Sequence, residues 1–392
     1  MEIVFWLSVF LIVYAYAGYP LSLALLKSRK GKKYVYDNED NKPVISIIIA
    51  AANEEGKIGA KLENTLALMY PYGSVEIIVT LDGATDNTAQ IVEHYINLNQ
   101  HRRILLLENE RGGKESAQLA AVRKATGDIF VFTDVATKLG PYTLHQLADN
   151  FFDPRVGAVD GMSRIESRSS NEGLYLKYEN KIREYESVLG SLVTMGGCLF
   201  AVRREIVQKT HTLPNGRVIP GFRPDRQSDF RTALMVKTAG YQAILDQNAV
   251  AVFADAANSS KEFERKHRTV VRGLANFFDH LYLLNPKHYG LFSYQLFCHK
   301  MCKWLVPFFM ITTFVSNVAL VFIITPCWTW SWWFWYLTYF GQVLFYIIAI
   351  LSTSNKYAKI IHFFAMSNLA ILKAWLSYIR GERYVSWNPT KR

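Results

Sequence analysis

Cysteine is scarce in this sequence. Four thiols, at Cys198, Cys298, Cys302 and Cys327, are spread over 392 residues, which is too few and too scattered for a disulfide framework. Cys298 and Cys302 lie one helical turn apart around His299, a spacing that can place two thiols on one metal ion. We favour the alternative that they are reduced thiols that pack as small apolar side chains.

Two further patterns are absent, and each excludes a class of ligand. No glycine fingerprint of the dinucleotide-binding type follows the first predicted strand, so we do not expect NAD binding. Aromatic and basic residues are not interleaved as on a nucleic-acid platform, although the net charge is +11. The basic residues instead follow the hydrophobic runs directly, so we predict contact with membrane lipid and none with nucleic acid.

The first hydrophobic run predicts a membrane anchor over residues 1–27. Residues 3–26 are apolar and long enough to cross a bilayer. A cleaved signal peptide would need a basic N-terminal region, but only Glu2 precedes the run, and the basic cluster at 27–33 follows it. This order predicts an uncleaved anchor whose C-terminal side lies in the cytosol.

A second membrane region is predicted over residues 291–392. The runs at 304–324 and 328–351 each suffice for a spanning helix, and the Thr325–Cys327 joint makes them a hairpin. The run at 360–379 is interrupted by Lys373 and is followed by a basic tail, which should remain in the cytosol. We therefore expect an interfacial or bundle-packed helix there rather than a third span in this region.

The chain between these regions, residues 28–290, predicts a cytosolic α/β domain. Strands at 44–52, 75–81, 104–107 and 129–133 alternate with helices through Leu62–Met69, 88–97 and 114–125, which indicates a doubly wound, mostly parallel sheet. Beyond residue 155 the pattern loosens. We expect strands at 156–161 and 196–202, helices at 172–193 and 230–239, and a basic segment at 261–279.

The strand at 129–133 delivers Asp134 just past its carboxyl end, which is where ligands bind in open α/β sheets. A carboxylate there can hold Mg²⁺ or a similar hard cation against a diphosphate. The alternative is an aspartate that caps the next helix.

Six short motifs, taken in order, resemble the family 2 glycosyltransferases with a GT-A fold. The resemblance covers roughly residues 44–280 and is closest to the membrane-embedded branch with bacterial exopolysaccharide, cellulose and hyaluronan synthases. The motifs are Ala51-Ala52-Asn53-Glu54, Asp82-Gly83-Ala84-Thr85-Asp86, Arg111-Gly112-Gly113-Lys114, Asp134-Val135-Ala136, Ser228-Asp229 and the segment 265–273.

For the donor, the resemblance implies a UDP-sugar. Ala52, Asn53 and Glu54 stand in the loop that holds base and ribose, and Asp82 stands where an aspartate pairs with the base. The glycine turn before Lys114 suits a diphosphate, because backbone N–H groups at a helix start and a lysine both favour anions. The alternatives are ordinary turn and helix-cap chemistry at Asp82 and a surface turn at 111–114.

For catalysis, the resemblance implies a metal site at Asp134 for Mg²⁺ or Mn²⁺ and a general base at Asp229. Ala136 stands where the family carries a second carboxylate, so this motif has one ligand instead of two. Asp229 would deprotonate the acceptor hydroxyl as it attacks the anomeric carbon. The alternative for Asp229 is an N-cap of the helix at 230–239.

For the acceptor side, Thr269, Arg272 and Gly273 stand where the processive synthases have Gln, Arg and Trp. Arg272, with Arg268 nearby, would neutralise the leaving diphosphate. Gly196 and Gly197 are assigned to the same acceptor and leaving-group region. A basic face turned toward lipid head groups is the alternative for this helix.

Together these features predict an inverting glycosyltransferase of a bacterial inner membrane that acts on a polysaccharide or other glycan acceptor at the cytosolic face. Two alternatives remain: transfer of a single sugar to a polyprenyl-phosphate lipid, and an inactive subunit of a polysaccharide assembly machine. With about three spanning helices per chain, a polymer channel would need several copies or an export partner.

Overall fold

The structure is a computed structural model, and it describes residues 1–27, 43–166, 171–212, 218–219, 221–254, 259–325, 328–351 and 355–384. Several predictions fall on residues outside these ranges. They concern most of the first basic cluster and the linker after it, Pro326 and Cys327 of the hairpin joint, and the last eight residues of the basic tail.

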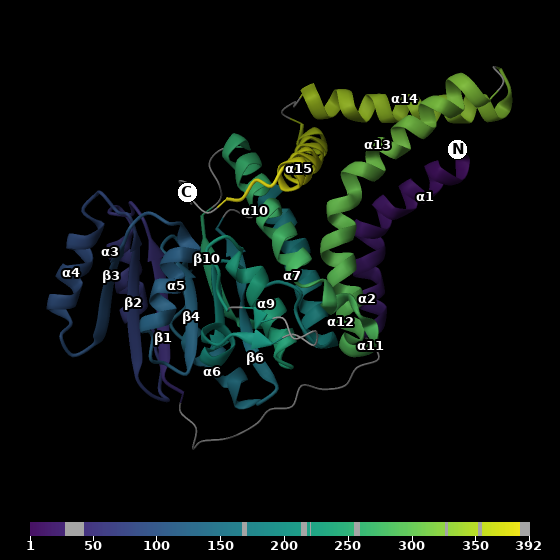
Figure 1. Cartoon of the computed structure of the whole chain (residues 1–392). Coiled ribbons are helices and arrows are strands. Elements are labelled where there is room, and N and C mark those ends of the chain that lie inside the picture. The colour runs from purple at the N-terminus through teal and green to yellow at the C-terminus, as the bar shows by residue number, and fades with distance from the viewer. Residues whose placement is uncertain are drawn as a thin grey trace.

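An eight-stranded mixed sheet forms the centre of the α/β domain, in the order β3-β2-β1-β4-β7-β6-β10-β5 (Figure 1). β1, β2, β3 and β4 are parallel neighbours, whereas β7 runs antiparallel to both β4 and β6. The predicted doubly wound, mostly parallel sheet is therefore confirmed. The strands are β1 Ile45–Ala51, β2 Val75–Asp82, β3 Arg103–Asn109, β4 Ile129–Asp134, β5 Lys138–Leu139, β6 Val156–Ile165, β7 Leu199–Arg203 and β10 Gln242–Phe253, with β8 His211–Thr212 and β9 Val218–Ile219 as a separate pair.

Helices cover both faces of this sheet, so its central strands are buried throughout. Every residue of β1 is buried, which accounts for its unbroken apolar sequence. β1 lies between β2 and β4, and this is where the strand order reverses. The carboxyl ends of these strands therefore form the edge at which such sheets bind ligands, and the region along this edge is called the crevice below. The covering helices are α3 Ile58–Leu66, α4 Thr88–Leu98, α5 Lys114–Lys124, α6 Thr143–Asp149, α7 Asn171–Leu189, α8 Arg204–Gln208 and α9 Ser228–Thr238.

Three predicted boundaries differ from the structure. The helix expected to reach residue 193 ends at Leu189, because Gly190 has a φ of +145° that L residues rarely adopt. The strand expected from residue 196 begins at Leu199, so Gly196 and Gly197 lie in the loop before it. α9 begins at Ser228 rather than at residue 230, which places Asp229 in its first turn.

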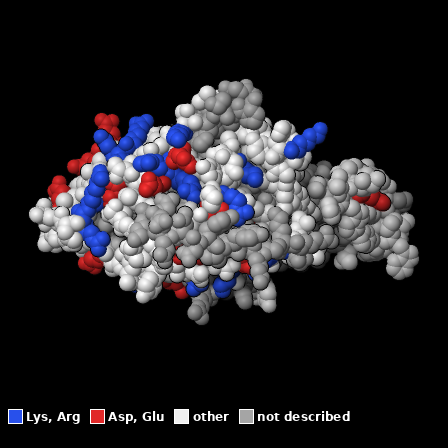
Figure 2. All heavy atoms as spheres, turned by 90° about the horizontal axis from the view of Figure 1, so that it is seen from below, with Lys and Arg blue, Asp and Glu red and all other residues white. Residues whose placement is uncertain are grey.

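Four described helices are long and apolar enough to cross a membrane: Glu2–Lys27, Leu291–Ile324, Trp330–Leu351 and Tyr357–Ile379. On the face shown in Figure 2, Lys, Arg, Asp and Glu gather over the α/β domain and are sparse over the hydrophobic helices. The elements are α1 Glu2–Val13, η1 Tyr14–Gly18 and α2 Tyr19–Lys27; α12 Leu291–Leu296, η4 Phe297–Cys302, α13 Lys303–Ala319 and η5 Leu320–Ile324; α14 Trp330–Leu351; and α15 Lys356–Ile379.

The last hydrophobic helix, α15, packs on the amphipathic helix α10 (Ser259–Asp279) of the α/β domain (Figure 1). Lys373 Nζ lies 3.3 Å from Glu264 Oε1 on α10. The Trp375 indole donates to the carbonyl oxygen of Trp304 on α13 at 2.9 Å. These contacts fit the predicted packed helix, while its relation to the bilayer stays a prediction.

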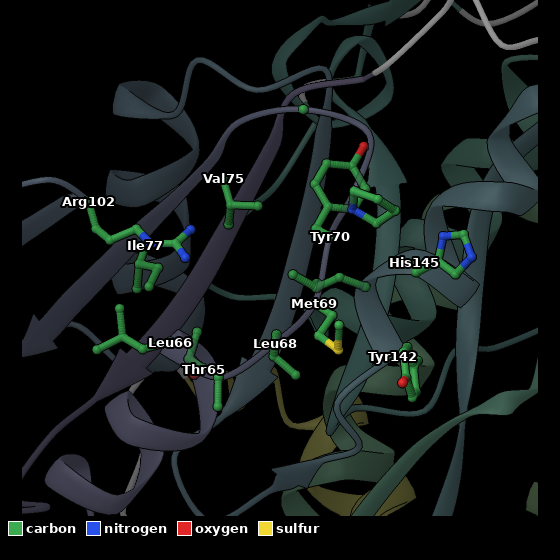
Figure 3. Close-up of a pocket in the computed structure, with 14 residues that line it drawn as sticks. Thr65, Leu66, Leu68, Met69, Tyr70, Val75, Ile77, Arg102, Tyr142 and His145 are labelled. Carbon is green, nitrogen blue, oxygen red and sulfur yellow. The ribbon is translucent and has the colours of Figure 1, made fainter.

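A cavity of about 530 Å³ opens beside β2, and Figure 3 shows its lining from α3, the following loop and α6. Val75 and Ile77, at the amino end of β2, form part of its wall. Asp82 ends the same strand seven residues later, about 23 Å away along an extended chain. This cavity is therefore remote from the crevice at the carboxyl ends of the strands.

Candidate active site

Asp82 organises the first part of the crevice from the end of β2. It is fully buried, and its Oδ1 accepts from the amides of Gly112 at 2.7 Å and Gly113 at 2.8 Å. These amides belong to the turn expected to hold a diphosphate and are bound to Asp82 here, so the diphosphate assignment stays a prediction that rests on Lys114. Asp82 Oδ2 is also buried and has no hydrogen-bond partner among the described residues, which leaves one acceptor available to a ligand.

The first predicted loop is tied to the second loop by polar contacts. The Thr85 amide donates to Asn53 Oδ1 at 2.8 Å, and the Glu54 amide donates to Thr88 Oγ1 at 2.9 Å. Ala52 is buried at the end of β1. Burial and the neighbouring carboxylates of Asp134 and Asp86 raise the pKa of Glu54, against the opposing charge of Lys57. The two loops therefore form one rim of the crevice.

Lys114 and Asp134 meet at the centre of the crevice. Lys114 Nζ lies 2.5 Å from Asp134 Oδ1 and donates to the Gly197 carbonyl oxygen at 3.3 Å. Burial opposes the charge of Lys114, but the Asp134 carboxylate outweighs it and raises the pKa of the amine. The pair connects α5, β4 and the loop before β7, and it unites three residues that the sequence had proposed separately.

Asp134 is the residue of this crevice best suited to hold a divalent cation. Its side chain is 37% exposed, so part of the carboxylate faces the crevice. Among the described residues, no group of three or more His, Cys, Asp or Glu side chains could hold a metal ion. Asp134 alone, with one oxygen paired with Lys114, could hold an ion of the Mg²⁺ type only if diphosphate oxygens and water supplied the other ligands.

Asp229 lies beside this pair, in the first turn of α9. A Cβ added to Gly197 would come within 2.9 Å of Asp229 Oδ2, so the carboxylate closely approaches the glycine backbone. The N-cap of α9 is Gln227, but Asp229 Oδ1 accepts from the Phe230 amide at 2.6 Å, so Asp229 also binds a first-turn N–H as the capping alternative expects. Asp229 is one of the charges that act on Lys114, and it therefore belongs to the same site as Asp134.

Arg272 reaches the same crevice from α10. Its guanidinium Nη2 lies 2.5 Å from Glu115 Oε1 in the first turn of α5 and donates to the Arg226 carbonyl oxygen at 2.7 Å. Glu115 is 4% exposed, and sequence reasoning missed it. Arg272 therefore lies near Lys114, because Glu115 directly follows Lys114, and its contact with a diphosphate stays a prediction. The charge of Arg272, however, is paired with Glu115 in this state.

Arg268 and Gly273 were also proposed for the acceptor side, and their surroundings differ from those of Arg272. Arg268 lies one turn earlier on α10 and is half-buried; within the described chain, no contact joins it to the residues of the crevice. At Gly273 an added Cβ would come within 3.0 Å of the Trp304 ring. The family motif has a tryptophan at the position of Gly273. In this chain the Trp304 indole, from a different helix, packs against Gly273.

A buried ion pair that sequence reasoning also missed supports the Gly196–Gly197 loop. Asp160 Oδ1 accepts from the Gly196 amide at 2.7 Å, and its Oδ2 pairs with the buried guanidinium of Arg183. Burial raises the pKa of Asp160 to about 6, with Arg183 opposing the rise. Asp160 and Arg183 come from β6 and α7, so only the folded sheet brings them beneath this loop.

Lys61 lies beneath Asp134, and its role was also missed. It is 3% exposed and donates to Thr133 Oγ1 at 2.9 Å and to the Thr137 carbonyl oxygen at 2.7 Å. It therefore holds both ends of the loop that carries Asp134. The sequence did contain a signal, because Lys61 falls on the same apolar helix stripe as Ile58 and Leu62.

The sheet order and the crevice define an α/β fold of the GT-A class. The structure aligns with the mannosyltransferase PcManGT from Pyrobaculum calidifontis, solved with GDP-Man and Mn²⁺, at a TM-score of 0.72 over 97% of this chain and 99% of that one. The identity is 22%, so this likeness establishes the fold. Residues 46–210 match the family Glycosyl transferase family 2, and the chain thus carries a domain of that family.

Curated relatives agree with this assignment over part of their length. The poly-beta-1,6-N-acetyl-D-glucosamine synthase of Staphylococcus aureus (strain MSSA476) is 30% identical over 176 residues, which are 43% of this chain and 42% of that protein. The hyaluronan synthase of Streptococcus pyogenes is 27% identical over 201 residues, or 47% of each chain. The chain thus spans less than half the length of these relatives.

The burial of Lys61 predicts a pH dependence of stability. Burial lowers the pKa of Lys61 from 10.5 to about 7. Above that value the native lysine is neutral while the unfolded lysine keeps its proton, so stability rises with pH until the unfolded lysine titrates. We expect this contribution to reach about 1 kcal/mol per pH unit and to vanish in Lys61→Met.

The measurement compares thermal unfolding of the detergent-solubilised wild type and Lys61→Met across this alkaline range. Lys124→Met, which removes an exposed lysine at the end of α5, is the matched control and should follow the wild type. Parallel curves for the wild type and Lys61→Met would show that native Lys61 keeps its proton.

Proposed function

We propose that this chain is an inverting glycosyltransferase that moves a sugar from a nucleotide-diphosphate donor to an acceptor at the membrane face. The observation that carries the proposal is the convergence of Asp82, Lys114, Asp134 and Asp229 at the carboxyl edge of one sheet. This transfer requires four groups, which these residues supply in the same order: an acceptor that pairs with the base, a cation that binds the diphosphate, a metal ligand and a general base.

The donor we propose is a UDP-sugar. The unpartnered Asp82 Oδ2 can accept from the imide N–H of uracil. The same oxygen suits N1–H of guanine, and PcManGT, which shares the fold, was solved with GDP-Man. The S. aureus relative is named for a polymer of N-acetylglucosamine. A nucleotide with an imide or lactam N–H is thus the class that Asp82 selects.

The residues around Asp134 would hold Mg²⁺ or Mn²⁺ together with the donor diphosphate, and the bound ion would neutralise phosphate charge. Lys114 supplies a second positive charge from the start of α5, where the helix dipole also favours an anion. Arg272 supplies a third once the diphosphate competes with Glu115 for its guanidinium. These cations stabilise the charge that the leaving nucleotide diphosphate develops.

Asp229 would take the proton from the acceptor hydroxyl. The acceptor oxygen then bonds to the anomeric carbon as the bond from that carbon to the phosphate oxygen breaks, which inverts the configuration. The electron pair leaves with the nucleotide diphosphate. The support for this role is that the Asp229 carboxylate adjoins Gly197, whose carbonyl oxygen accepts from Lys114.

The second candidate is an inactive assembly subunit, which Ala136 favours because it removes one metal ligand. We prefer the enzyme, since the base, the remaining metal ligand and both cations of the diphosphate site are present and contiguous.

Nucleotide-sugars are made in the cytosol, so we place the α/β domain on the cytosolic face of a bacterial membrane, with a glycan or lipid-linked acceptor.

The base assignment predicts a selective loss of turnover. Asp229→Asn keeps the side-chain shape but removes the proton acceptor, so we expect turnover to fall about 10²–10⁴-fold with donor affinity unchanged. Initial rates and donor titrations on purified protein measure both. The control is Asp149→Asn, on the exposed side of α6, which should leave both unchanged. Turnover within a few-fold of wild type in Asp229→Asn would remove Asp229 from the role.

The metal assignment predicts a change in the metal dependence of nucleotide binding. Asp134→Ala should abolish the effect of Mn²⁺ on the affinity for UDP, because the motif contains no other carboxylate. Ala136→Asp should strengthen the effect by restoring a second ligand. Titrations of UDP and GDP, with Mn²⁺ or with chelator, measure both effects and the base preference. Unchanged Mn²⁺ dependence in Asp134→Ala would place the metal elsewhere.

The topology predicts the side on which the C-terminal tail lies. If α15 packs along the domain without crossing, a single cysteine at Pro389, in a chain without the four native thiols, should react with an impermeant maleimide only after the membrane is permeabilised. Labelling in intact cells would instead mean that α15 crosses the bilayer.

A further inference from the structure

A cavity of about 680 Å³ lies where the α/β domain meets the hydrophobic helices. Its walls come from α7, α10, the η4–α13 segment and α15, with Tyr16 of the N-terminal helix at one edge. None of the residues expected to bind the donor nucleotide lines it. A further ligand can therefore enter it while the donor site is filled.

One end of the cavity adjoins the general base. Gln227, the N-cap of α9, lines the cavity and lies two residues before Asp229. Lys300 also lines it, with its ammonium 4.8 Å from the ring centroid of Phe230, the residue that follows Asp229. The Lys300 charge acts on Asp229 and on Glu179. This part of the cavity wall therefore lies close to Asp229 in the chain and in space.

Lys300 is available to an anion at this end. It lies in η4, a π-helical stretch within the Leu291–Ile324 helix, and such stretches often occur at functional sites. Its neighbour Lys303 is neutralised by Glu179 at 2.6 Å, and His299 contacts Glu186 at 2.6 Å and Glu179 at 3.0 Å. Within the described chain, no carboxylate comes within ion-pair distance of Lys300.

A second wall of the cavity belongs to a candidate membrane helix and is mostly apolar, although Lys266 of α10 lies over the Phe363 ring at 5.5 Å and donates to Ser367 Oγ at 3.1 Å. Ile360, Phe363, Phe364 and Ile371 of α15 form this wall, and Leu174 of α7 also lines the cavity. α15 lies within one of the four stretches long and apolar enough to span a bilayer. A ligand along this wall can bury hydrocarbon without leaving the membrane region, whereas a free sugar chain would gain nothing from it.

We propose that this cavity holds the acceptor and that the acceptor is a lipid-linked saccharide with a phosphate or diphosphate in its head group. The phosphate lies against Lys300, the hydrocarbon chain runs along α15, and a sugar hydroxyl faces Asp229, which receives its proton. The proposal rests on the proposed function for the role of Asp229, and it adds the acceptor class and a binding site for it.

The test measures lipid binding to the full-length protein without any nucleotide-sugar. A diazirine-tagged farnesyl phosphate labels the protein in detergent, and untagged farnesyl phosphate, farnesol and inorganic phosphate compete. Because a hydrogen-bonded charge in a buried site contributes substantially to affinity, farnesyl phosphate should compete at about a tenfold lower concentration than either fragment. Mass spectrometry should place the label on the cavity walls, in α7, α10, η4–α13 or α15.

Two variants address the two features of the cavity. Lys300→Met should make farnesyl phosphate and farnesol compete about equally, while Lys287→Met, an exposed lysine of α11 (Pro286–Tyr289) outside the cavity, should keep the wild-type preference. Thr269→Trp adds an indole to an exposed position of the cavity wall and should reduce labelling by all probes. Thermal unfolding of each variant confirms that it is folded.

Three results would overturn the proposal. Equal competition by farnesol and farnesyl phosphate in the wild type would mean an unselective apolar cavity. Equal competition by inorganic phosphate would mean a site for a free anion, and label outside the cavity walls on α7, α10, η4–α13 and α15 would mean that the lipid binds elsewhere. Failure of Asp229→Asn to lower turnover would overturn the base assignment but leave these binding results intact, so the two failures are distinguishable.

Discussion

The ion pair between Lys114 and Asp134 is the interaction on which the arrangement of the crevice depends. It joins the first residue of α5 to the last residue of β4, and the same ammonium also holds the loop at Gly197. The Lys114 ammonium offsets part of the repulsion among Asp134, Asp229 and Glu54, which gather at one sheet edge. A donor diphosphate enters a site in which the positive charge is already in place.

Buried carboxylates also fix both glycine turns of the crevice. Asp82 accepts from Gly112 and Gly113, and Asp160 accepts from Gly196. A Cβ at Gly196 would come within 2.6 Å of Arg183 Nη1, and one at Gly112 would come within 2.8 Å of Ser116 Oγ in the helix that follows. The turns are therefore held in position before any ligand binds, which lowers the ordering cost of binding.

The hydrophobic helices are coupled to the crevice through charge. Glu186 of α7 contacts His299 and accepts from the Tyr19 hydroxyl at 2.5 Å, so α7, α2 and η4 share one buried polar cluster. Although burial opposes its ionisation, Lys303 and His299 hold the pKa of Glu179 well below its ordinary value. Because η4 also carries Lys300, a shift of this helix relative to α7 would move a positive charge relative to Asp229.

The sequence by itself determined the strand and helix order, the parallel part of the sheet and the positions of Asp82, Lys114, Asp134 and Asp229 near one edge, because apolar runs and strand ends are local properties. The tertiary structure alone decided which atoms meet: that the amides of Gly112 and Gly113 bind Asp82, that Glu115 pairs with Arg272, and that Trp304 covers Gly273. These contacts join residues from 30 to more than 150 positions apart, and no local pattern encodes the distance between them. The sequence indicates that Lys61 lies on the apolar stripe of its helix. Its acceptors, Thr133 and Thr137, were defined only when β4 packed against α3.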